Sequence, residues 1–93
     1  MIDTVLAWNF EVVPAKFDEL AHVCKVAGGG SALVPWLKAL KAKVGIEGGL
    51  AARGVTAADL PRLVDIATKD ICHQTNPRAC TSTDFERRFL AAM

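Results

Sequence analysis

The chain is poor in the features that mark membrane, secreted and metal-binding proteins. Its longest apolar run is far shorter than the ~20 residues that a membrane span requires. Asp3 stands where a signal peptide would carry a basic residue, and no apolar signal core follows. The only histidines are His22 and His73, and neither belongs to a zinc-binding motif. We therefore expect a soluble, cytoplasmic protein with no metal site of its own.

Strong charge and paired cysteines are missing as well. Eleven basic and ten acidic residues are interspersed to a net charge of +1, with no basic stripe, so nucleic acid is not an expected partner. The three cysteines, Cys24, Cys72 and Cys80, are odd in number and irregular in spacing, which favours a reducing compartment over a disulfide framework. The hydrophobic share of 52% is high for 93 residues, so some apolar surface is expected to stay exposed.

The first half of the chain predicts three helices and no strand. Residues 2 to 9 form an apolar helix, and Pro14 begins a second helix that ends at Gly28-Gly29-Gly30. The buried face of this second helix is predicted to hold Phe17, Leu20, Ala21, Cys24 and Ala27. Ser31 is expected to cap a third helix reaching Val44, with Leu33, Leu37, Leu40 and Val44 as its apolar stripe and Lys38, Lys41 and Lys43 in water. Trp8 and Trp36 are interpreted as packing residues, and Gly45 fits a left-handed helix end.

The second half predicts further helices, each marked by a capping signal. A short helical piece over 47–52 is closed by Gly54. Thr56 with Asp59 and Thr81 with Asp84 have capping-box spacing. Pro61 starts a main helix to about His73, with Leu63, Val64, Ala67 and Ile71 inward, and the last helix buries Phe85, Phe89 and Ala92. The fold class is all-α, a small bundle of about five to six helices in a single domain over residues 1–93.

Two motifs invite a chemical interpretation, and we give both little weight. Gly28-Gly29-Gly30-Ser31 resembles a phosphate-binding loop, but it follows a helix and lacks the Lys-Ser/Thr of a P-loop, so a flexible helix end is favoured. Cys72, His73 and Cys80 supply zinc-type ligands, but their spacing matches no common site and a fourth ligand is missing. Asp65, Asp70, Glu86, Arg87 and Arg88 are interpreted as a solvated face or as contacts to another domain.

The tail carries the most specific signal. Asp70, Cys72, Asn76-Pro77-Arg78, Thr81 and Asp84 stand in the order Asp-x-Cys-x-x-x-Asn-Pro-Arg-x-x-Thr-x-x-Asp. This pattern resembles the C-terminal end of the iron-dependent (group III) alcohol dehydrogenases. Upstream, Val44-Gly45-Ile46 and Gly54-Val55 also resemble that family, although the family usually has a proline where this chain has Glu47.

The resemblance implies the distal part of the family's helical C-terminal domain. A full-length relative would bind NAD(P) on an N-terminal domain and iron (or zinc) in the helical domain, and this chain is expected to hold neither. No catalytic, cofactor-binding or metal-ligating residue is therefore assigned to it. Cys72, by position, would be a substrate-side wall residue; the alternative is a small buried hydrophobe. Pro77 and Asn76 predict a turn, and Arg78 a structural contact.

Three other interpretations stay open. The chain could be a freestanding helical interaction or dimerisation module, a part of a maleylacetate reductase-like enzyme, or a small enzyme using Cys72 or Cys80. As a fragment-like helical domain, it is expected to be inactive alone and to expose an apolar face. The partner for that face is either the missing dinucleotide-binding domain or a second copy of the chain.

Overall fold

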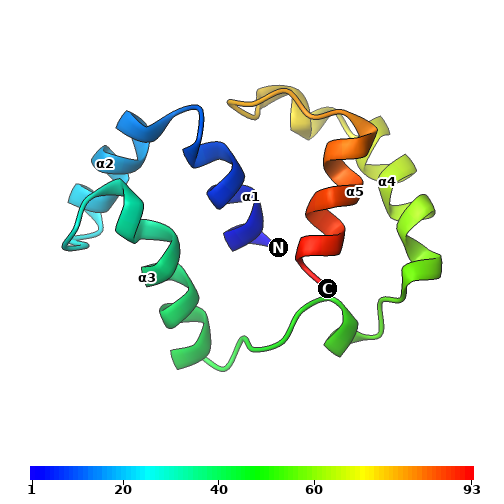
Figure 1. Ribbon diagram of the computed structural model, residues 1–93, viewed down its shortest axis with the longest axis horizontal. Coiled ribbons are helices and arrows are strands. Elements are labelled where there is room, and N and C mark those ends of the chain that lie inside the picture. The colour runs from blue at the N-terminus through cyan, green and yellow to red at the C-terminus, as the bar shows by residue number, and fades with distance from the viewer. The chain divides into compact units, whose positions relative to one another are not determined.

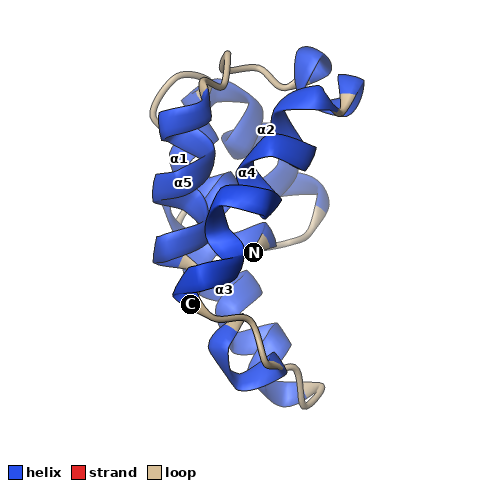
Figure 2. Ribbon diagram, turned by 90° about the vertical axis from the view of Figure 1, so that its right-hand side faces the viewer, coloured by secondary structure: helices blue, strands red, loops and turns tan.

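The computed structural model describes residues 1–93, and all of its regular structure is helical (Figures 1 and 2). The five α-helices are α1 (Ile2–Phe10), α2 (Pro14–Val23), α3 (Gly30–Lys43), α4 (Leu60–Lys69) and α5 (Ser82–Ala91). Three 3₁₀ turns, η1 (Ala51–Arg53), η2 (Ala57–Asp59) and η3 (Ile71–Thr75), complete the list. The all-α fold class is confirmed. No helix has the length and apolarity that crossing a bilayer would require.

Contacts between the helices divide the chain into two compact units, which are described separately. The N-terminal unit is Ile2–Glu47, and the C-terminal unit is Gly48–Met93 together with Met1. The prediction of one helical domain over residues 1–93 stays a prediction.

The core of the N-terminal unit forms where α3 packs against α1 and α2. Phe17, Ala21 and Leu33 are buried at its centre, and burying a phenylalanine of this kind contributes about 1.5–3 kcal/mol. Phe10 meets Phe17 edge to face, with ring centroids 5.3 Å apart. Five partly buried apolar residues surround this centre: Leu6, Phe10, Val13, Val26 and Val34.

Helix α2 begins as predicted and ends earlier. Pro14 occupies its first turn, where a missing N–H costs little. The helix ends at Val23, because Lys25 turns left-handed (φ 56°) and the Val26 amide donates to the Ala21 carbonyl. The predicted extension to the glycines is therefore wrong. Phe17 and Ala21 are buried as predicted, but Leu20, Cys24 and Ala27 are exposed.

Helix α3 agrees with its prediction in length and differs in detail. It ends as expected with Gly45 left-handed (φ 77°). Leu33 is buried and Leu37 half-buried, whereas Leu40 and Val44 are exposed. Lys41 was expected in water, but its Nζ donates to Asp3 Oδ1 at 2.9 Å and so ties α3 to α1. Trp8 is buried as a packing residue should be; Trp36, on α3, is 38% exposed, so a packing role is not confirmed for it.

The C-terminal unit is built on α4 and α5, which lie side by side and run in opposite directions (Figure 1). Leu60 is its most buried large side chain on α4, a residue that the predicted inner face omitted. Leu63, Val64 and Ala67 are half-buried as predicted, and so are Phe85 and Phe89 on α5. Ala92, the residue that caps the end of α5, is buried. These two faces supply the apolar contact between the helices.

The segment before α4 closes the C-terminal end of α5. The predicted helical piece over 47–52 is wrong, since only the single turn η1 forms. The Leu50 amide instead donates to the Ala92 carbonyl at 2.8 Å, which satisfies a carbonyl that a helix end leaves unpaired. A Cβ on Gly49 would collide with the carbonyl oxygens of Ala92 and Met93, so this approach requires glycine. Gly54 closes η1 in the left-handed region, as predicted.

The predicted solvated face is largely confirmed. Lys69 donates to Asp65 at 2.8 Å, and this i,i+4 pair is open to water, so it adds little stability. Glu86 and Arg87 are exposed as well, while Arg88 is half-buried. Asp70, from the same predicted set, has a different role in the loop that follows α4.

Candidate functional site

The loop between α4 and α5 starts with a change of helix type at Asp70. Its carboxylate Oδ1 accepts the Cys72 amide at 2.8 Å and caps the 3₁₀ turn η3. Helix α4 therefore ends at Lys69, four residues before the predicted end at His73, and Ile71 leaves the inner face to become 73% exposed. The hydrogen bond from the Cys72 amide lowers the pKa of Asp70.

Cys72 lies exposed in this turn. The alternative of a small buried hydrophobe is therefore wrong. Its thiol donates a hydrogen bond to the Asp70 carboxylate, and this bond, together with the negative charge of the carboxylate, raises the pKa of Cys72. A nucleophilic cysteine requires the opposite shift, because the thiolate is the reactive species. The structure thus offers an exposed but unactivated thiol.

Cys80, at the other end of the loop, is unactivated for a different reason. Burial is the main cause that raises the pKa of this thiol, and the Asp84 carboxylate raises it further. Both shifts run against a nucleophilic role for these cysteines, so they give no support to the interpretation as a small cysteine enzyme.

His73 packs against the helices rather than toward the cysteines. Its ring meets Phe85 edge to face at 5.4 Å, and its Nε2 lies 3.2 Å from the Thr68 carbonyl oxygen. No group of three or more histidine, cysteine, aspartate or glutamate side chains is placed to hold a metal ion. His22, the other histidine, belongs to the N-terminal unit. The geometry gives His73 a structural role at the joint of η3 and α5.

Asn76-Pro77-Arg78 forms the predicted turn. Asn76 has extended backbone (ψ 138°), as a residue before proline should. Its side-chain amide donates to the Arg78 carbonyl at 2.6 Å, and Thr75 Oγ1 donates to the Cys72 carbonyl at 3.0 Å. These short bonds hold the loop that carries Cys72. The side-chain role of Thr75 was not visible in the sequence, because hydroxyl bonds within a turn depend on its backbone path.

The helix start at Gly28-Gly29-Gly30, in the N-terminal unit, is already bound by a side chain of the same unit. The Gly30 amide, at the start of α3, donates to Asp18 Oδ1 at 2.7 Å. Gly29 is the N-cap, so the expected cap at Ser31 is wrong, and the Ser31 hydroxyl contacts the Gly28 carbonyl at 3.4 Å. Asp18 thus takes the place that an anion would need. Sequence reasoning missed Asp18, because a cap from another helix leaves no local signal.

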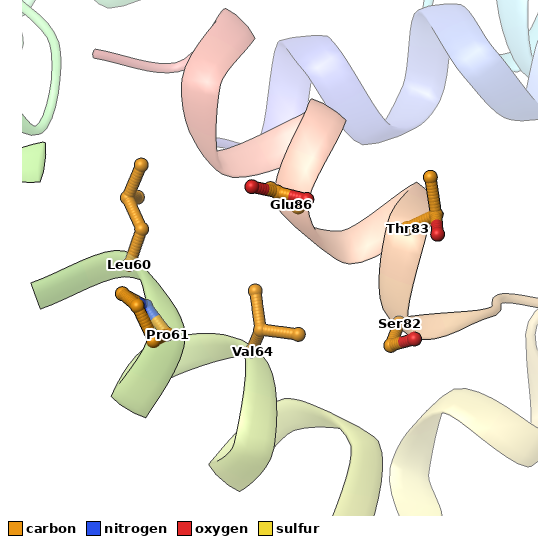
Figure 3. Close-up of a pocket in the computed structure, with 6 residues that line it drawn as sticks. All are labelled: Leu60, Pro61, Val64, Ser82, Thr83 and Glu86. Atoms are coloured by element: carbon orange, nitrogen blue, oxygen red, sulfur yellow. The ribbon is translucent and has the colours of Figure 1, made fainter.

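A groove separates α4 from α5 near the start of α4 (Figure 3). It has a volume of about 290 Å³ and is lined by Leu60, Pro61, Val64, Ser82, Thr83 and Glu86. Figure 3 shows the apolar residues on α4 and the polar ones on α5, with Glu86 on the side of α5 toward Leu60 and Val64. The groove brings together no pair of groups able to move a proton or hold a metal.

The comparison with known families gives the decisive observation. The family model described as "Fe-containing alcohol dehydrogenase family, C-terminal" matches residues 1–93. The chain belongs to this Fe-containing alcohol dehydrogenase family. The predicted resemblance is confirmed over the whole chain, including the residues before position 37, where no family motif was predicted. Neither the curated proteins nor the solved structures gave a significant match.

The residues of this chain do not form a set of ligands that fits the iron after which the Fe-containing alcohol dehydrogenase family is named. Iron sites of enzymes are built from imidazoles and carboxylates that converge on one point. Here the two histidines lie in different units, and no cluster of three candidate ligands forms. The chain contributes helices and an ordered loop, and no metal centre.

Proposed function

We propose that this chain is the distal part of the helical C-terminal domain of an NAD(P)-dependent, iron-containing (or zinc-containing) alcohol dehydrogenase, inactive by itself. The observation that carries the proposal is the match of the family's C-terminal model to residues 1–93. The partner of the chain is the preceding portion of such an enzyme, which carries the dinucleotide-binding domain and the metal ligands. The three free thiols agree with a reducing cytoplasm.

In this role the loop from Asp70 to Cys80 supplies an ordered wall on the substrate side. Cys72 is exposed and its thiol is kept protonated, so it offers a small, neutral and unreactive surface to a substrate. A neutral wall suits hydride transfer, since the alcohol and the nicotinamide exchange the hydride directly and need no thiolate. The bonds of Asp70 and Thr75 to the backbone of Cys72 keep the wall in place.

Complementation of a split enzyme tests the proposal. The preceding portion of a closely similar family member is expressed separately, loaded with its metal, and mixed with the chain, and NADH formation from a primary alcohol is followed. We expect activity in the mixture and none in either part alone. Cys72→Trp, which would crowd the wall, should raise KM or lower kcat in the mixture, whereas Cys24→Trp should not. A mixture that binds but stays inactive would contradict the proposal.

A further inference from the structure

At the end of α4, two side-chain hydrogen bonds replace one helical hydrogen bond. If α4 continued past Lys69, the Cys72 amide would donate to the Thr68 carbonyl, four residues back. In the structure the Cys72 amide donates to Asp70 Oδ1 at 2.8 Å instead. The Thr68 carbonyl, in the last turn of α4, lies 3.2 Å from His73 Nε2. Because a carbonyl oxygen only accepts, Nε2 carries the hydrogen of this bond and donates it.

The position of Ile71 shows that a longer helix would bury more apolar surface. Ile71 is four residues after Ala67 and seven after Val64, and both of these are half-buried on the inner face of α4. In a continued helix this spacing would place Ile71 on the same face, which packs against α5. In η3 it is 73% exposed instead. The two side-chain hydrogen bonds therefore hold α4 at its observed end against the burial of Ile71.

His73 connects the turn η3 to both of the neighbouring helices. Besides its bond to Thr68 on α4, its ring meets Phe85 on α5 edge to face, with centroids 5.4 Å apart. His73 is half-buried, whereas Cys72 is exposed. Successive side chains of a 3₁₀ turn point about 120° apart, so one can be anchored while the next faces out. All of these residues belong to the C-terminal unit.

We infer that His73 is a positioning residue for Cys72. By donating to the Thr68 carbonyl, it keeps that carbonyl from accepting the Cys72 amide, so α4 ends, η3 forms and Cys72 stays in the exposed turn. The inference rests on the proposed function for the use of Cys72 in a substrate-side wall. It adds the residue that sets where the wall lies, and the hydrogen bond through which that residue acts.

Two variants of the 93-residue chain separate the hydrogen bond of His73 from its ring contact. His73→Phe keeps an aromatic ring for Phe85 and loses the N–H, whereas His73→Gln keeps an N–H equally many bonds from the backbone and loses the ring. The readout is the NMR coupling across a hydrogen bond from the Cys72 amide nitrogen to the Thr68 carbonyl carbon, which a continued helix produces. We expect this coupling in His73→Phe, with new Overhauser contacts from Ile71 to α5, and no coupling in the parent or in His73→Gln.

A matched control and a double variant define the limits of the readout. Gln74→Ala, at an exposed position of the same turn, should show no coupling. Asp70→Ala combined with His73→Phe removes both side-chain bonds and should show the strongest coupling. Coupling in the double variant but not in His73→Phe would assign the positioning to Asp70 alone. No coupling in either would mean that α4 ends for another reason, and each of these two results would overturn the inference.

The split-enzyme assay separates this inference from the proposed function. In the active mixture, His73→Phe should raise KM for the alcohol more than it lowers kcat, because the wall has moved, and His73→Gln should stay near the parent. An equal effect of both variants would mean that His73 only stabilises the loop, and would overturn the inference while the proposed function stands. No activity with the parental chain would overturn the proposed function, and the NMR comparison would still decide whether His73 positions Cys72.

Discussion

Single residues decide where the helices stop and how close they approach. Lys25 ends α2 from the left-handed region, Asp18 caps α3 from a neighbouring helix, and Asp70 converts the end of α4 into a 3₁₀ turn. Lys25 acts through its backbone angle, and Asp18 and Asp70 each act through one side-chain hydrogen bond to a backbone amide. Two predictions belong to this scale.

Position 30 requires glycine, because the structure leaves no space there for a Cβ atom. A Cβ at this position would lie 2.8 Å from both the Asp18 amide nitrogen and the Phe17 carbonyl carbon, and backbone atoms cannot yield as a side chain would. Gly30→Ala should therefore lower the free energy of unfolding by about 1–3 kcal/mol, as overpacking does. Gly45→Asn is the control: its Cβ would meet nothing within 4 Å, and asparagine tolerates the left-handed backbone. Urea unfolding measures both, and an Ala variant as stable as the parent would disprove the close contact.

The reactivity of Cys72 should depend on Asp70. Because the carboxylate raises the pKa of the thiol, less thiolate is present near neutrality than at an ordinary cysteine. Asp70→Asn keeps an oxygen for the Cys72 amide and removes the charge. In a Cys24→Ser, Cys80→Ser background, it should speed iodoacetamide alkylation at about pH 8, and leave the rate unchanged at about pH 11, where the thiol is ionised in both. An equal rate at the lower pH would show that the two side chains do not interact.

At the scale of the element, the chain is a set of short helices with well-marked starts. Thr56 and Asp59 form the predicted capping box, with Thr56 amide and hydroxyl both donating to Asp59 Oδ2, at 2.9 and 2.7 Å. Thr81 and Asp84 repeat it at 3.0 and 2.7 Å, and the Asp84 amide donates back to Thr81 Oγ1 at 3.2 Å. These motifs are local, so the sequence predicted them.

The capping boxes should make stability depend on acid. Hydrogen bonds from Thr56 and Thr81 lower the pKa values of Asp59 and Asp84 below the ordinary 3.8. A lowered pKa contributes stability above the unfolded value, and this contribution disappears as the pH falls through the folded value. The melting temperature should thus hold at neutral pH and drop below about pH 4. Asp59→Asn with Asp84→Asn should flatten that drop, while Ser82→Ala, at a side chain that takes no part in the hydrogen bonds of the box, should not. An unchanged acid profile in the double variant would contradict the assignment of this acid dependence to the two capping boxes.

Helix ends were harder to predict than helix starts, for a physical reason. The rule that glycine ends a helix succeeds at Gly45 and Gly54, where glycine adopts the left-handed angle itself. It fails at α2, because Lys25 accepts that angle five residues before Gly30. It also fails at Asp70, where a side chain competes for the backbone and no glycine is present. Caps that cross between helices, such as Asp18 on Gly30, depend on the packed structure alone.

In the candidate site, too, the local features could be predicted from the sequence, and the features that depend on the folded structure could not. Asn76-Pro77 predicted the turn correctly, because proline restricts the backbone of the residue before it. The exposure of Cys72 could not be foreseen, since it follows from the 3₁₀ geometry that Asp70 imposes on η3. The same switch moved Ile71 from the predicted inner face to solvent.

The whole molecule consists of short helices in two compact units, and the C-terminal unit presents an ordered loop. Its family membership is established over residues 1–93, and the residues brought together include no cluster for a metal and no free helix start for a phosphate at Gly30. Our central proposal is that coenzyme and metal are bound by a preceding portion of the family enzyme, and that this chain binds neither.

Heat stability in the presence of ligands tests this claim most directly. The chain is melted alone, with NADH and NADPH, and with ferrous iron or zinc, each up to millimolar concentration. A site of its own, filled at about 100 times its dissociation constant, would add roughly 2.7 kcal/mol to the free energy of unfolding and raise the melting temperature visibly. The account predicts no shift with any ligand. A saturable rise that His73→Ala or Asp18→Asn removes would contradict it, and would assign a ligand site to this chain.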